Sequence, residues 1–154
     1  MRDVRSDLLT FDLGSQRCAV ALADVVEVVR MVAMSHLPDA PPLVEGIINL
    51  RGQVVPVLDL RARFGLASKA VDLSDHLVVA RAGPRLAAIR VDHARALVDV
   101  GPGDVEAGAS TGNALAGVAK LPDGLVLIHD LATFLSAAEG ERLDAALDAA
   151  DRGR

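Results

Sequence analysis

The residues best suited to metal binding or nucleophilic chemistry in this chain are four histidines and one cysteine. The histidines stand far apart in sequence, without the spacing of an HExxH or a His-x-x-x-His motif, at His36, His76, His93 and His129. Cys18 lies in an apolar stretch, which is typical of a buried small hydrophobe more than of an activated thiolate. We therefore expect no metal, no other cofactor and no catalytic residue.

Two carboxylates raise the question of acid–base catalysis. Asp59 and Asp130 each follow an apolar segment and precede a short Leu-rich stretch. At such a strand-to-helix junction an aspartate accepts hydrogen bonds from the free amides of the next helical turn. We favour capping for both residues over a catalytic pair. The chain also lacks a Gly-x-Ser-x-Gly motif and a Walker A motif.

Composition indicates a folded domain with an aliphatic core. The chain has 154 residues, of which 51% are hydrophobic and 24% charged, with three Phe and neither Trp nor Tyr. Its net charge is −5, and Lys and Arg are scattered, so we expect no nucleic acid as a partner. Residues 1–7 lack the apolar stretch of a signal peptide, and no apolar run is long enough to enter a membrane. These features favour the cytoplasm.

The periodicity predicts short β-strands and one helix. The expected strands lie at 9–13, 20–22, 25–29, 47–50, 54–58, 77–80, 86–91, 96–100, 117–121 and 125–129. Arg51 and Gly52 form a hairpin turn, residues 60–64 a helical turn, and 101–113 a Gly-rich loop. An amphipathic helix is expected at 137–150, either as a lid on the second lobe or as a partner-binding element.

An internal repeat divides the chain. Five residues recur 71 positions later: Gly46, Leu50, Val55, Asp59 and Leu60 match Gly117, Leu121, Val126, Asp130 and Leu131. Three more recur 68 positions later: Arg17, Ala19 and Asp24 match Arg85, Ala87 and Asp92. We expect one domain over 1–154 with two small β-barrel lobes at about 15–75 and 76–135, which share an aliphatic seam. The N-terminal strand could pair with either lobe. Arg51 departs from the repeat, because its counterpart is Pro122.

The segment VEGIINLRGQVVPVLDLR at residues 44–61 resembles the signature hairpin of the CheW family of chemotaxis coupling proteins. The similarity extends to FDLG at 11–14, Val25-x-Glu27-Val28 and GVAKL at 117–121. It implies an all-β fold of two intertwined, five-stranded SH3-like barrels with a C-terminal helix. The implied function is that of a non-enzymatic adaptor between the regulatory domain of a CheA-like histidine kinase and the cytoplasmic tips of chemoreceptors.

The family's partner-binding positions fall on six residues of this chain: Val25, Glu27, Gly46, Asn49, Leu50 and Arg51. Two positions depart from the family pattern, because Cys18 replaces a common aromatic residue and His129 replaces an aliphatic one. We expect a protein that is mainly monomeric when isolated. The pathway stays open among flagellar chemotaxis, pilus motility and surface sensing. The alternative function is a small ligand-binding barrel or hydrolase that uses the cleft between the lobes, with Asp59 or Cys18.

Overall fold

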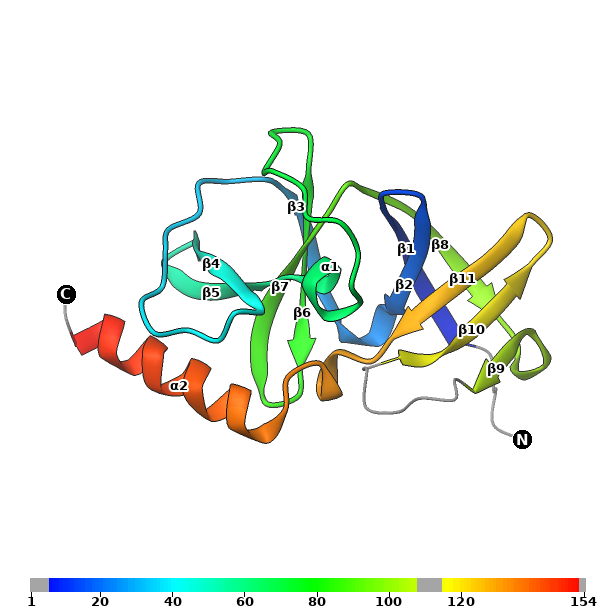
Figure 1. Ribbon diagram of the computed structural model, residues 1–154. Helices are drawn as coiled ribbons and strands as arrows, with labels where there is room; N and C mark the ends of the chain where they lie inside the picture. The colour runs from blue at the N-terminus through cyan, green and yellow to red at the C-terminus, as the bar shows by residue number, and fades with distance from the viewer. Residues whose placement is uncertain (1–5, 108–114, 153–154) are drawn as a thin grey trace.

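The chain folds into two β-sheets and a C-terminal helix (Figure 1). The computed structural model describes residues 6–107 and 115–152. One sheet has six strands in the order β8-β1-β2-β11-β10-β9, and the other has five in the order β3-β6-β7-β5-β4. The strands are β1 (Ser6–Leu13), β2 (Gln16–Ala21), β3 (Val25–Arg30), β4 (Val44–Leu50), β5 (Gln53–Leu58), β6 (His76–Ala82), β7 (Arg85–Val91), β8 (His93–Val100), β9 (Val105–Ala107), β10 (Leu115–Leu121) and β11 (Gly124–His129).

The helical elements are short apart from the last. They are η1 (Leu22–Asp24), α1 (Leu60–Arg63), η2 (Pro102–Asp104), η3 (Leu131–Thr133) and α2 (Ala137–Arg152). The expected Gly-rich loop over 101–113 therefore contains η2 and β9, while 108–113 lie outside the described residues. Among the described residues, no helix is both long and apolar enough to cross a membrane.

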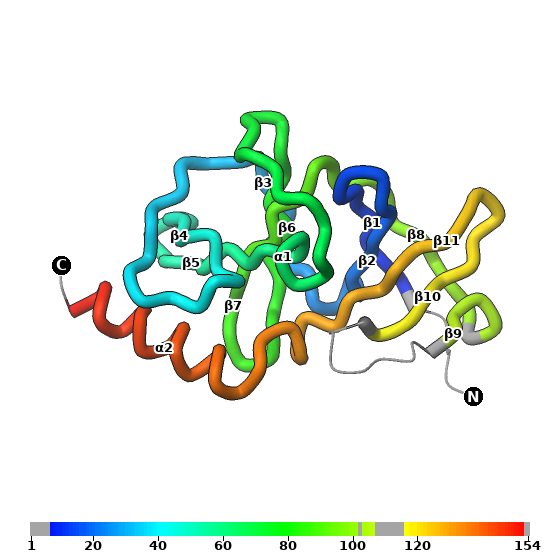
Figure 2. Tube along the Cα trace, viewed as in Figure 1, coloured from blue at the N-terminus to red at the C-terminus, as the bar shows by residue number. Residues whose placement is uncertain are grey.

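The two lobes exchange strands, so they are not consecutive halves of the chain. Strands β1 and β2 join β8–β11, whereas β3–β5 join β6 and β7. Parallel pairing makes both connections, between β2 and β11 and between β5 and β7. Figure 2 shows the blue β1–β2 hairpin beside β11 and the cyan β4–β5 hairpin beside the green β7. The sheets thus divide the chain differently from the expected lobes 15–75 and 76–135. The β1–β2 hairpin lies between β8 and β11 of the second half, and the β4–β5 hairpin pairs with β7 of the second half.

The strand pairings that close the two barrels lie at equivalent positions of the internal repeat. Ser35 pairs with Ile47 in one lobe, and Glu106 pairs with Val118 in the other, each residue being matched 71 positions later. Glycine permits the close approach at both places. A Cβ atom on Gly46 would lie 2.5 Å from the Ser35 carbonyl oxygen, and one on Gly117 would lie 2.7 Å from that of Glu106. The duplication is therefore visible in backbone packing as well as in sequence.

An aliphatic core joins the two sheets. The largest cluster combines Phe11, Cys18 and Val20 from one sheet with Val78 and Ile89 from the other, as the expected shared seam requires. Cys18 is 1% exposed, and burial raises the pKa of its thiol to about 12. Cys18 therefore acts as a small apolar residue of the core.

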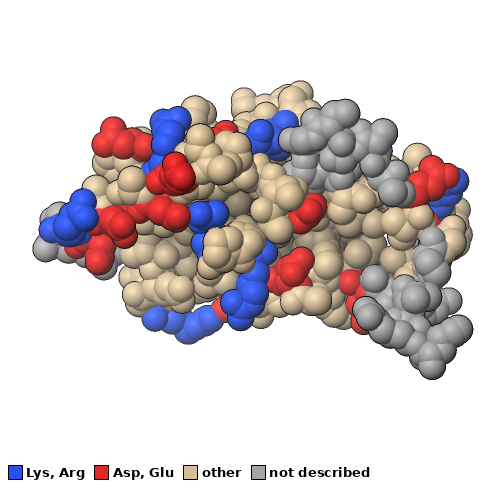
Figure 3. All heavy atoms as spheres, turned by 90° about the horizontal axis from the view of Figure 1, so that it is seen from below, with Lys and Arg blue, Asp and Glu red and all other residues tan. Residues whose placement is uncertain are grey.

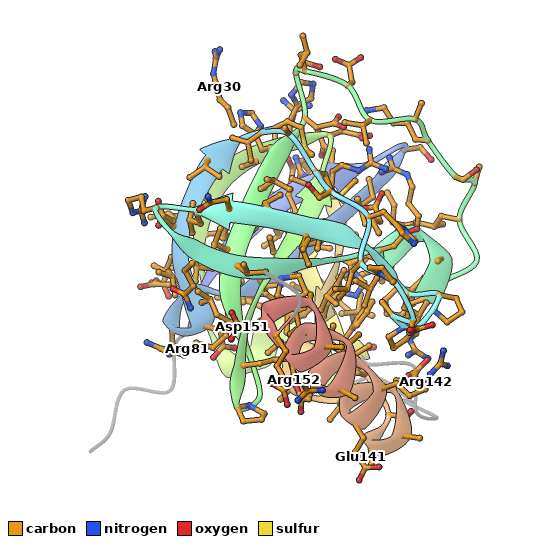
Figure 4. The ribbon with its side chains drawn as sticks, turned by 90° about the vertical axis from the view of Figure 1, so that its left-hand side faces the viewer. Arg30, Arg81, Glu141, Arg142, Asp151 and Arg152 are labelled. Carbon is orange, nitrogen blue, oxygen red and sulfur yellow. The ribbon has the colours of Figure 1, made fainter. Side chains whose placement is uncertain are left out.

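Helix α2 covers one end of the five-stranded lobe. Its buried residues Leu143 and Ala146 pack on Leu37, with Val44 and Ile47 beside them. The helix thus lies on the Pro-rich segment and β4, which belong to the first half of the chain and not to the second. On the face seen in Figure 3, Lys and Arg are interspersed with Asp and Glu over the molecule, without a one-sign stripe. Glu141 and Arg142 point away from the strands (Figure 4).

Candidate partner-binding site

The tip of the β4–β5 hairpin is a rigid two-residue turn. Arg51 and Gly52 both have positive φ angles, 51° and 88°, which suit the right-handed twist of a hairpin. The side-chain oxygen of Asn49 accepts a hydrogen bond of 2.7 Å from the Gly52 amide. Proline cannot adopt a positive φ, so the counterpart turn at Pro122 has a different conformation. The tip therefore presents Arg51 outward, with 70% of its side chain exposed.

Arg51 forms a two-pronged ion pair with Glu27. Its Nη1 atom donates to Glu27 Oε1 at 3.1 Å, and its Nη2 atom donates to Oε2. Glu27 lies on β3 and Arg51 follows β4, which are the two edges of the five-stranded sheet. They meet because the sheet curls into a barrel. The hydrogen bond from Arg51 lowers the pKa of Glu27, and the same bond raises the pKa of Arg51.

The other predicted residues have packing or backbone roles as well. Val25 is half-buried and packs against the main core, and Leu50 is half-buried against the cluster that contains Ile48. Gly46 is buried beneath Ser35. The structure thus brings Asn49, Leu50 and Arg51 to one tip and joins Glu27 to them through the ion pair. Val25 lies on β3, two residues before Glu27, and Gly46 lies on β4, five residues before Arg51.

Sequence reasoning missed an apolar surface on the same strand. Val26 and Val28 are 47% and 40% exposed, and Val32 beyond the strand is 42% exposed. Residues 25–30 alternate between half-buried and exposed, so these valines face away from Glu27. Among the described residues, strand β3 pairs with β6 alone, and its last residue, Arg30, projects away from the barrel (Figure 4). The signal was the run VVEVVR, but its valines on both faces concealed which side is buried.

A groove of about 430 Å³ lies beside the hairpin tip. Ile47, Gly52, Gln53 and Val54 form one wall, and the end of α2 forms the other with Leu147, Asp148, Ala150 and Asp151. Ile47, Val54 and Leu147 give the groove apolar lining, while the helix side carries the two carboxylates of Asp148 and Asp151. The groove extends the surface around Arg51 toward α2.

No catalytic constellation accompanies this surface in the part of the chain that the structure describes. Asp59 accepts a hydrogen bond from the Ala62 amide at 3.2 Å, and Asp130 accepts one from the Ala132 amide at 3.0 Å. Both carboxylates are therefore helix caps, as the sequence predicts. No group of three or more His, Cys, Asp or Glu residues could hold a metal ion within the described ranges. The two barrels and the preformed tip define a class of protein, the small β-barrel interaction module.

Comparison with known proteins identifies the family within this class. Residues 7–139 match the family model of the CheW-like domain, and the chain belongs to that family. The chemotaxis protein CheW of Helicobacter pylori is 27% identical over 77% of this chain and 74% of its own length. The one from Klebsiella aerogenes is 25% identical over 92% and 88%. The expected family is confirmed.

A solved structure supports the same assignment. The scaffolding protein TtCheW from Thermoanaerobacter tengcongensis matches with a TM-score of 0.79 and 26% identity, over 87% of this chain and 94% of that one. The expected fold, two SH3-like barrels, is confirmed, as is the adaptor character of the chain. The chain is a non-enzymatic scaffold of chemotaxis signal transduction, and the hydrolase alternative is not supported.

Proposed function

We propose that this chain couples a CheA-like histidine kinase to the cytoplasmic tips of chemoreceptors through a surface centred on the Arg51–Glu27 ion pair. The full surface comprises Val25, Glu27, Gly46, Asn49, Leu50 and Arg51, with Val26 and Val28 added. The observation that carries this proposal is the preformed tip, which holds an exposed guanidinium in a fixed direction before any partner arrives. Preorganisation of this kind lowers the entropic cost of binding.

Arg51 is suited to contact a receptor helix. Its guanidinium has N–H donors beyond the two that Glu27 occupies, and these can donate to carboxylates or carbonyl oxygens of a partner. Glu27 fixes the orientation of the guanidinium. Asn49 and Gly46 support the hairpin, through the bond to Gly52 and through the close contact with Ser35.

The exposed valines supply the apolar part of the surface. Val26 and Val28 stand on a strand whose second edge has no β-strand beside it among the described residues. Interfaces combine an apolar centre with a polar rim, and this strand has both features side by side. We expect the apolar lobe ends to contact the regulatory domain of the kinase. We expect the isolated chain to be mainly monomeric and to lie in the cytoplasm, where the kinase and the receptor tips bind to it.

Reversal of the ion pair tests the proposal. The double variant Glu27→Arg with Arg51→Glu keeps opposite charges in contact but exchanges their positions. We expect its urea unfolding midpoint to stay near that of wild type, while its affinity for receptor-tip fragments in the presence of a CheA-type kinase falls about fivefold to a hundredfold. Arg51→Ala should lose affinity to a similar degree with little effect on unfolding, since the Arg51 side chain is 70% exposed.

A second exposed ion pair gives the matched control. Arg95 on β8 donates to Asp12 at 2.6 Å in the other lobe, and its side chain is 57% exposed. Arg95→Ala should leave receptor binding unchanged. Wild-type affinity in the reversed pair, or an equal loss in Arg95→Ala, would contradict the assignment of the site.

A further inference from the structure

The groove between the β4–β5 hairpin and the end of α2 continues the core outward to the surface. Ile47 from the hairpin and Leu147 from the helix line it, and both also pack against the buried cluster around Leu143. Its volume is about 430 Å³. An α-helix with its side chains is about 10 Å across, so a space of this size accommodates inserted side chains and not the helix that carries them. The groove therefore suits a partner helix that lies across its mouth.

Asp148 and Asp151 form the rim of the groove on the helix side. They stand three residues apart on α2, which places them on one face of the helix. Both are exposed, and neither forms a hydrogen bond or an ion pair within the described ranges. By contrast, Glu139 and Asp144 of the same helix each form an ion pair with an arginine. In Figure 4, Asp151 lies on the side of α2 that is turned toward the strands.

These carboxylates stand at an unfavourable end of the helix. The C-terminal end of a helix carries partial negative charge, which disfavours acidic side chains in its last turn. Asp151 is the last residue but one of α2, and Arg152, the basic residue of that turn, forms no ion pair with a described residue. A cation supplied by a partner would be attracted by both carboxylates and by the helix end. The rim therefore complements a Lys or Arg side chain.

The opposite wall of the groove adjoins Arg51. Gly52 and Gln53, which line this wall, directly follow Arg51 in the hairpin. A partner across the mouth therefore meets a cation on one side, apolar side chains in the groove, and two carboxylates on the other side. On a helix, side chains three or four residues apart lie on one face. One face of a partner helix can thus present an acidic, an apolar and a basic residue in this order.

We propose that the receptor-tip helix that contacts Arg51 also lies across this groove, where it inserts an apolar side chain and places a Lys or Arg beside Asp148 and Asp151. This inference rests on the proposed function and adds to it the charge order of the receptor face. The receptor is the expected occupant because the groove adjoins Arg51, whereas the exposed valines of β3 line no part of it. Helix α2 then has both roles that its amphipathic sequence allows, a cover for the lobe and a partner-binding element.

Two charge reversals on the same helix test the groove. Asp151→Lys and Glu141→Lys change the net charge equally, but Glu141 points away from the strands (Figure 4). Both variants are titrated against receptor-tip fragments with a CheA-type kinase present. Asp151→Lys should bind at least about fivefold more weakly than wild type, while Glu141→Lys should bind as wild type does. The urea unfolding midpoint of Asp151→Lys should not fall, since a cation suits the C-terminal end of a helix.

The same titration of Arg51→Ala separates this proposal from the one on which it rests. A loss of affinity in Arg51→Ala with wild-type affinity in Asp151→Lys would overturn the groove contact alone, as would an equal loss in Glu141→Lys. Wild-type affinity in both Arg51→Ala and Asp151→Lys would overturn both proposals. A loss in Asp151→Lys alone would support the groove contact and refute a surface centred on Arg51.

A titration against the regulatory domain of the kinase, without receptor, identifies the occupant. Asp151→Lys should bind this domain as wild type does. A loss of affinity there would assign the groove to the kinase and overturn the receptor helix as its occupant.

Discussion

Gly46 and Gly117 have the same steric role in the two barrels. At each, the carbonyl oxygen of the closing segment occupies the space of a Cβ atom, at 2.5 Å from Gly46 and 2.7 Å from Gly117. Gly46→Ala and Gly117→Ala should each lower the free energy of unfolding by about 1–3 kcal/mol, because backbone has to move. Gly103 has ordinary φ and open space around it, so Gly103→Ala should cost far less. Urea unfolding measures all three, and equal losses would refute the steric account.

His129 makes stability depend on pH. Its pKa in the folded chain is about 4, below the ordinary 6.5, because burial disfavours the charged ring. The unfolded chain therefore binds the proton more tightly. The contribution of the neutral ring is complete above pH 6.5 and is lost as pH falls from 6.5 to 4, on the order of 3 kcal/mol in all.

The measurement is the free energy of unfolding of wild type and His129→Leu between pH 4 and pH 7. Carboxylates contribute equally to both proteins, so the difference between the two curves isolates His129. A difference that does not change with pH would show that His129 titrates normally in the folded chain.

At the scale of elements, the duplicated caps explain why two aspartates stand 71 residues apart. Asp59 begins α1, and Asp130 begins η3, with nearly equal backbone angles. Asp59→Ala and Asp130→Ala should each cost about 0.5–2 kcal/mol of stability, while Asn substitutions should retain most of it. Affinity for receptor-tip fragments should stay unchanged in Asp130→Ala. If Asp130→Ala weakens binding and leaves unfolding unchanged, the capping role is wrong.

Most strands and turns could be predicted from sequence because they depend on local chemistry. Alternation located β1, and the pair Arg51-Gly52 located the β4–β5 turn, since such turns need residues that tolerate positive φ. Strand β9 was missed because three residues are too short for a periodic signal. The sequence also could not predict which hairpin joins which lobe. The pairs β2–β11 and β5–β7 join strands that are far apart in the chain, and such pairing leaves no local sequence pattern. For the site, the ion pair of Arg51 with Glu27 depends on barrel closure, which spacing does not reveal.

At the scale of the whole molecule, Asp92 links the two lobes. Its carboxylate accepts hydrogen bonds from the Gly14 amide at 2.7 Å, from Arg61 at 2.8 Å and from Lys69 at 3.1 Å. Burial alone would raise its pKa, but these bonds together lower it to about 2. Gly14 belongs to the β1–β2 turn of one lobe, whereas Arg61 lies in α1 beside the other.

Removal of this carboxylate should weaken the whole fold. Asp92→Ala leaves the nearly buried Arg61 without its partner and should cost about 3 kcal/mol. The exposed pair of Arg17 and Asp123 serves as control, and Asp123→Ala should cost under about 0.5 kcal/mol. Chemical unfolding should show one transition in every case, because both lobes share one core. Separate transitions would mean that the lobes are independent.

The exchange of strands between lobes also bears on how such a chain could have arisen. Each barrel combines the first hairpin of one repeat with the later strands of the other. A polypeptide with a single repeat would therefore have every kind of strand that a barrel needs. Its first hairpin, however, would belong to one barrel and its later strands to another. Two copies related by a two-fold axis would supply both barrels by domain swapping. The present chain has the architecture of such a swapped homodimer whose two subunits became joined in one gene, after which Arg51 and Pro122 could diverge and give the barrels different surfaces.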